Sequence, residues 1–82
     1  MGHRIVPGRR VKMALLRSVL AGNVRRARDA RGWSQEHLAE RAGLTQVYIS
    51  QIETSKTAAS VDTIEKLAAG FEVDARELLF RC

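Results

Sequence analysis

Apolar residues recur every three or four positions along most of this 82-residue chain, a spacing typical of amphipathic helices. No segment alternates between apolar and polar residues as a half-buried strand does. The pattern predicts an all-α fold, a compact domain of five helices with a basic N-terminal arm or an extra helix. The expected helices lie at about 11–31, 35–41, 46–53, 61–71 and 75–80.

The first helical stretch owes its pattern to four apolar residues, Leu16, Leu20, Val24 and Ala27. Gly22 and Asn23 weaken its middle, because both residues are poor helix formers. The stretch is therefore either one long helix or two shorter ones. Residues 1–10 have no apolar periodicity, so we expect residues 1–12 to form a flexible basic arm and residues 13–82 to form the folded domain.

Residues 33–53, WSQEHLAERAGLTQVYISQIE, predict two short helices joined by a tight turn. Ser34 can cap the first helix and Thr45 the second, since a hydroxyl oxygen accepts hydrogen bonds from the free N–H groups of a first turn. Gly43 suits the left-handed conformation that ends many helices. The inward positions are small or apolar residues, namely Leu38, Ala39, Ala42, Ile49 and Ile52.

The second of these helices exposes four residues that suit contact with DNA bases, Gln46, Val47, Ser50 and Gln51. A helical hairpin that only builds a core would explain the apolar residues equally well, but a merely solvated helix normally carries Lys and Glu on its outer face. Glutamine can pair with adenine in the major groove, and an apolar side chain can pack on a thymine methyl group. Residues 34–53 therefore predict a helix-turn-helix that reads DNA.

Charge is distributed unevenly along the chain. Residues 1–31 hold nine Lys or Arg and one acid, whereas residues 32–82 hold five basic and eight acidic side chains, and the total is +5. A strongly basic segment favours an anionic partner. A solvated tail that aids solubility explains the same charge equally well.

Other classes of protein find no support in the sequence. Cys82 is the only cysteine, so an internal disulfide is excluded and nothing indicates an oxidising compartment. No apolar run reaches membrane-spanning length, and we expect a cytoplasmic protein without a membrane partner. His3 and His37 have no cluster of ligands at metal-binding spacing, and no nucleophile stands with a partner base. We therefore expect no enzyme, no metal or other cofactor, and no small-molecule substrate.

Residues from about Val24 to Leu79 resemble the Cro/repressor-type helix-turn-helix family, also called the XRE family. The resemblance rests on the segments SQEHLAERAGLTQVYISQIE, SVDTIEKLAAGFEV and DARELL, and it covers about two thirds of the chain. It implies a Cro/repressor-like fold and a sequence-specific regulator of transcription that binds double-stranded DNA.

The resemblance also implies that some of the site residues read bases and others contact phosphates. Gln46 and Gln51 are expected to lead the base reading, with Val47 on a thymine methyl group and Ser50 adaptable. Gln35 begins the first helix of the pair, where the family usually contacts a phosphate, and it is also placed to brace Gln46. The expected phosphate or positioning residues are Gln35, Thr45, Tyr48, Lys56, Thr57, Arg25 and Arg26. Within this set, Tyr48 either reaches a phosphate, which we favour, or packs at the helix edge, and the two arginines either contact phosphates or face solvent.

Some matching positions have a structural meaning. Arg28 and Glu53 occupy positions that often form a salt bridge in this family, so we expect Arg28 to tie the first helix to the reading helix. Ser55 and Ala59 stand in a loop where Gly and Pro are common, and Glu72 stands where a helix-ending Gly is usual. These departures leave the path of the loop and the join between the last two helices open.

A single reading helix covers only a few base pairs, so we expect a homodimer on a near-palindromic operator. Its reading helices would lie about one DNA turn, roughly 34 Å, apart. The expected dimer surface consists of Val73, Leu78, Leu79 and Phe80, although these residues could instead cap the monomer core. Repression is the default mechanism. The alternative class is an antitoxin-type module, which binds a small toxin protein and represses its own operon.

Overall fold

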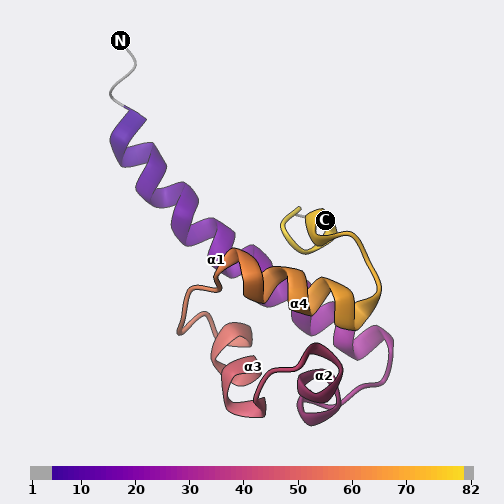
Figure 1. Cartoon of the computed structure of the whole chain (residues 1–82). Helices are drawn as coiled ribbons and strands as arrows, with labels where there is room; N and C mark the ends of the chain where they lie inside the picture. Colours follow the sequence, from indigo (N-terminus) through magenta and orange to yellow (C-terminus); the bar gives the residue numbers. More distant parts are fainter. Residues whose placement is uncertain (1–4, 81–82) are drawn as a thin grey trace.

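The computed structural model describes the backbone of residues 5–80 and the side chains of residues 16–80. Over this range the chain forms α1 (Ile5–Ala30), α2 (Gln35–Ala42), α3 (Gln46–Glu53), α4 (Val61–Phe71) and a short 3-10 helix, η1 (Ala75–Leu78), with no strand (Figure 1). The all-helical prediction is confirmed. The count of five α-helices is not, because η1 is held by 3-10-type hydrogen bonds such as that from Glu77 N to Asp74 O, 2.9 Å.

The first helix is a single continuous element. Of the two alternatives open for its middle, one long helix is found, and it begins at Ile5, ahead of the predicted start at residue 11. Its N-terminal part projects from the body of the domain (Figure 1). Residues 1–4 of the predicted arm lie outside the described residues, and the flexibility of the arm stays a prediction. Within the described range, no helix is long and apolar enough to span a bilayer.

Asn23 is accommodated in α1 because its buried side chain fastens the C-terminal turn. Its Nδ2 donates to the carbonyl oxygens of Leu78 and Phe80, at 2.8 Å each. The Oδ1 atom of Asn23 accepts a hydrogen bond from Arg26 Nη2 at 2.5 Å. All the polar atoms of this amide are therefore used, which removes the cost of burying it. Asn23, which weakens the helical pattern of the sequence, thus connects α1 to the C-terminal residues Leu78 and Phe80.

The core lies between the pair α2–α3 and the helices α1 and α4. Five side chains there are almost completely enclosed, namely Val24, Leu38, Ile49, Ile52 and Leu67. All five predicted inward residues of the helix pair are buried, as predicted. Burial of this apolar surface is the main force that holds the two short helices, since helices of eight residues are marginal alone.

The end of α4 shows how the chain replaces the glycine that is usual there. Glu72 adopts the left-handed conformation, with φ 61° and ψ 45°, a strained conformation for a residue with a side chain. Arg41 Nε donates to Gly70 O at 2.8 Å, and Arg31 Nη2 donates to Phe71 O at 3.1 Å. These two arginines satisfy carbonyl groups that a helix end leaves free. These contacts fix the end of α4, from which the chain turns toward η1.

Candidate nucleic-acid interface

The turn between α2 and α3 has the cap geometry that the sequence predicted. Ser34 Oγ accepts a hydrogen bond from His37 N at 3.0 Å, and Thr45 Oγ1 accepts one from Tyr48 N at 3.1 Å. Gly43 adopts the left-handed conformation, with φ 70° and ψ 34°. Both caps and the glycine turn are therefore confirmed, and together they orient α3 across α2.

A shallow surface hollow of about 510 Å³ lies along the outer face of α3. It is lined by the four predicted base readers together with Gln35, Thr54 and Lys56. Val47 is 68% exposed, so its side chain is free to meet a partner. Thr54 had not been singled out from the sequence, and its hydroxyl donates to Ser50 O at 2.9 Å. The structure thus gathers residues from α2, α3 and the following loop, most of them polar, around one shallow hollow.

Glu53, the last residue of α3, is the buried anchor of this surface. Its side chain forms a two-pronged ion pair with Arg28, with Nε to Oε2 at 2.8 Å and Nη2 to Oε1 at 3.0 Å. Arg28 also donates to Trp33 O at 2.9 Å. Hydrogen bonding to Glu53 raises the pKa of Arg28 above its ordinary value, against the opposing effect of burial. The ion pair implied by the family resemblance is therefore present, and it ties α1 to the end of the reading helix.

Gln35 is held by the same carboxylate. Its Nε2 donates to Glu53 Oε1 at 3.1 Å, and within the described part of the chain no hydrogen bond joins it to Gln46. The bracing of Gln46 is thus not formed in the free protein. Gln35 nevertheless borders the hollow, because it is the first residue of α2 and lies beside the end of α3.

Comparison with known proteins agrees with this geometry. A family model described as helix-turn-helix, HTH_3, matches residues 24–78. The chain belongs to the HTH_3 family. This confirms the XRE-type resemblance and places the chain among DNA-binding regulators of transcription.

Named relatives of this HTH_3 chain include transcription factors and controller proteins. The chain is 45% identical over 64 residues to the Neisseria hypothetical transcription factor of Neisseria meningitidis. The matched segment makes up 78% of this chain and 60% of that protein. The crystal structure of the hypothetical transcription factor NHTF from Neisseria matches with a TM-score of 0.78 at 44% identity, and the match covers 80% of this chain and 76% of that one. The crystal structure of the restriction-modification controller protein C.AhdI from Aeromonas hydrophila matches with a TM-score of 0.73 at 34% identity. That match covers 76% of this chain and 94% of the controller protein.

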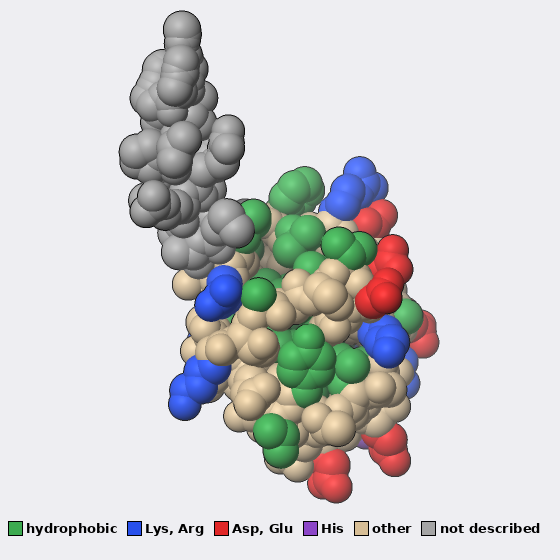
Figure 2. Space-filling view, turned by 60° about the vertical axis from the view of Figure 1, so that its left-hand side comes forward, with side chains coloured by type: hydrophobic (Ala, Val, Ile, Leu, Met, Phe, Trp, Pro, Cys, Tyr) green, Lys and Arg blue, Asp and Glu red, His purple; other side chains and the backbone are tan. Residues whose placement is uncertain are grey.

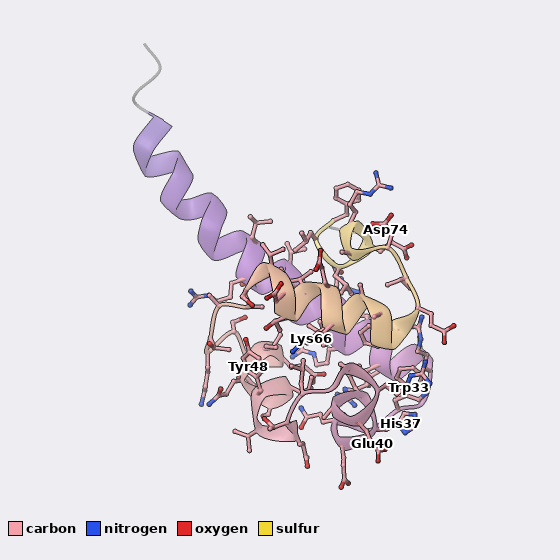
Figure 3. The ribbon with its side chains drawn as sticks, viewed as in Figure 1. Trp33, His37, Glu40, Tyr48, Lys66 and Asp74 are labelled. Carbon is pink, nitrogen blue, oxygen red and sulfur yellow. The ribbon has the colours of Figure 1, made fainter. Side chains whose placement is uncertain are left out.

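Tyr48 packs against the body of this HTH_3 domain. Its hydroxyl forms a hydrogen bond of 3.1 Å with Thr63 Oγ1 on α4, and its ring lies half-buried against the core (Figure 3). The structure therefore supports packing at the helix edge, the alternative to the phosphate contact that we favoured from the sequence. A tyrosine in such a position usually packs its ring against apolar side chains, while its hydroxyl forms a hydrogen bond.

The two neighbouring arginines of α1 point to different places. Arg25 Nη1 donates to Glu53 O at 3.0 Å, which places it at the C-terminal end of α3 beside the reading surface. Arg26 bonds to Asn23 and borders a separate hollow between α1 and η1. Successive helical residues are about 100° apart, so both could not face the same side. Only Arg25 is brought to the reading helix, and the expectation of a phosphate contact by Arg26 loses its support.

The loop after α3 begins with a residue in a strained conformation. Ser55 has φ 60°, at a place where the family commonly has glycine. The loop closes the end of α3, because Lys56 N donates to Gln51 O at 2.9 Å. Lys56 is exposed and lines the hollow, whereas Thr57 is half-buried and does not.

The C-terminal apolar residues divide between core and surface. Leu78 is only 2% exposed and belongs to the monomer core, so its assignment to a dimer surface is wrong. Val73 and Leu79 are half-buried against that core, while Phe80 is 64% exposed. Helical period could not separate these residues in advance, because only Leu78 lies within η1, and the other three stand outside any regular helix.

Proposed function

We propose that this protein is a dimeric, sequence-specific repressor that reads the major groove of a near-palindromic operator with α3. The observation that carries the proposal is the hollow along α3, where Gln46 and Gln51 are exposed and make no side-chain hydrogen bond within the described residues. Two uncommitted amides on a helix whose other side is buried suit bidentate pairing with bases. The named relatives, a transcription factor and a restriction-modification controller, support the regulatory role.

Neighbouring groups are suited to positioning the helix on the DNA backbone. Thr45 has a hydroxyl hydrogen that its capping bond leaves free, because there the oxygen is the acceptor. Lys56 adds an exposed positive charge at the edge of the hollow. Arg25 adds another at the C-terminal end of α3. Contacts of this kind fix register without reading sequence.

An apolar surface away from the reading helix supports the dimer. A second hollow, of about 460 Å³, lies between α1, the loop before α4, and the C-terminal residues, and its lining includes Leu16, Ile64 and Leu79. Among the side chains that the structure describes, Leu16 and Phe80 are two of the four large apolar ones that are exposed. Figure 2 shows hydrophobic side chains gathered on this face. We expect the twofold contact to form at this surface, and occupancy of the operator by the dimer would exclude polymerase.

Alanine substitution of the two glutamines tests the base-reading assignment. DNA sequences selected from a random pool by the wild-type protein would supply the site. Gln46→Ala and Gln51→Ala should each weaken binding to that site by about 1–3 kcal/mol and relax selection at one base per half-site. Glu65→Ala, an exposed substitution on α4 outside the hollow, is the matched control. Unchanged affinity in both glutamine variants would show that α3 does not read the bases through these residues.

A further inference from the structure

The charged residues of α1 are all basic up to its last turn. The first acidic residue of the chain is Asp29, whereas residues 1–28 hold eight Lys or Arg. Arg17 is the first of these basic residues whose side chain the structure describes. It is exposed, and within the described side chains it forms no ion pair. A cation on a helix without acidic neighbours is suited to bind an anionic group of a partner.

The helical period places Arg17 on the side of α1 that faces α3. Arg17 and Arg28 are 11 residues apart, which is about three turns of an α-helix and about 16 Å along its axis. Arg28 lies on the α3 side, because its guanidinium pairs with Glu53 at the end of α3. Arg17 therefore extends the same side of α1, three turns toward the N-terminus (Figure 1).

The loop after α3 connects this position with the reading hollow. Lys56 lines the hollow along α3, and Ala58 and Ala59 border the apolar hollow together with Arg17. The stem of Arg17 thus lies at an apolar surface while its charged end extends into water, as in many long basic side chains. Arg25, at the end of α3, stands between the other two cations. A row of positive charges therefore leads away from the reading helix along α1.

We propose that Arg17 binds a DNA phosphate outside the bases that α3 reads, so that the side of α1 extends the contact with the DNA backbone. This inference rests on the proposed function of α3. Arg17 lies about 12 Å along α1 from Arg25, and each DNA strand carries a phosphate about every 3.4 Å of its axis. The two arginines can therefore bind different phosphates. Such a contact adds affinity and salt dependence but no sequence preference.

The salt dependence of DNA binding tests this contact. Arg17→Gln should reduce the slope of log affinity against log salt concentration by about 1 for each copy bound, because one phosphate contact is lost. Binding to a selected site and to an unrelated sequence should weaken by the same factor. Arg26→Gln is the matched control, because Arg26 is nine residues from Arg17 and lies on the opposite side of α1, beside η1. It should leave the slope unchanged.

Two further measurements locate the contact. On a duplex trimmed to the selected bases, the wild-type protein and Arg17→Gln should bind with equal affinity, because the flanking phosphates are absent. On the longer duplex, Arg17→Lys should keep the wild-type salt slope, since a lysine also binds phosphate as a point charge.

Equal salt slopes in the wild-type protein and Arg17→Gln would overturn the proposal, and so would a change in base preference. Because Arg17 also borders the apolar hollow, sedimentation of Arg17→Gln is measured as well. A weaker dimer would assign the residue to the dimer surface and refute its role on DNA. A protein that selects no DNA sequence but keeps the Arg17-dependent slope would refute the proposed function and leave the backbone contact standing.

Discussion

At the scale of single residues, Glu53 has the largest influence on the reading surface. It joins α1 through Arg28, α2 through Gln35, and α3 through its own backbone, and it is almost completely buried. A buried charge is tolerated only with its partner, and removal of one partner leaves the other uncompensated. The pair is therefore a structural requirement for the position of α3, whatever α3 binds.

Replacement of Arg28 tests this requirement. Arg28→Ala should lower the free energy of unfolding by about 3–5 kcal/mol, because it leaves the Glu53 carboxylate buried without a counter-charge. Arg28→Lys keeps the charge but loses the two-pronged geometry, so its loss should be smaller. Urea denaturation followed by circular dichroism measures both. A loss below about 1 kcal/mol in Arg28→Ala, the level of an exposed pair, would show that the pair does not hold the helices together.

Whether a contact could be predicted from the sequence depends on how far apart its two residues lie along the chain. Ser34, Thr45 and the outer face of α3 followed from local rules, since caps and helical period act within a few residues. The bonds from Gln35 to Glu53 and from Tyr48 to Thr63 join separate elements, so period alone could not reveal them. Only the Arg28–Glu53 pair, also distant in sequence, was expected, and that expectation came from the family resemblance.

At the scale of elements, α2 packs closely against α4, and α3 packs in turn on α2 and α1. A Cβ atom added at Gly70 would lie 3.3 Å from the backbone of Ala42. Small residues at this crossing let the two backbones pack directly. The bounds of α2, α3 and α4 could be predicted from period and caps to within one residue. The start of α1 could not, because residues 1–10 carry no apolar stripe to indicate a helix.

Alanine at two glycines should have opposite effects on stability. Gly70→Ala gains helix propensity, but the new methyl group meets backbone that cannot move aside, so we expect a net loss of about 1–2 kcal/mol. Gly22→Ala is the matched control in α1, where the new Cβ would meet only the flexible end of Arg26 at 3.3 Å. It should gain about 0.5–1 kcal/mol. Thermal unfolding of both variants measures the difference, and a gain at both positions would show that α2 and α4 can separate freely.

At the scale of the whole molecule, two of the hollows on the described surface differ in their chemistry. The hollow along α3 is lined mainly by polar side chains, and the hollow beside Leu16 and Leu79 mainly by apolar ones. A monomer gains nothing from exposing an apolar hollow and the Phe80 side chain, because contact with water costs free energy at both. The twofold dimer proposed above would remove both from water if each copy inserted Phe80 into the hollow of the other.

In the proposed dimer, association should be sensitive to Phe80. Each substitution is present twice in a twofold contact, so a loss of about 1–2 kcal/mol per copy weakens association by roughly 30- to 1,000-fold. Phe80→Ser should therefore shift sedimentation from dimer to monomer at micromolar concentration and abolish the dependence of DNA affinity on half-site spacing. Val61→Ser is the matched control, because Val61 is 72% exposed but does not line the apolar hollow. A dimer of unchanged strength in Phe80→Ser would place the twofold contact elsewhere, whereas equal weakening in both variants would mean that a broader apolar surface, rather than the hollow, holds the copies together.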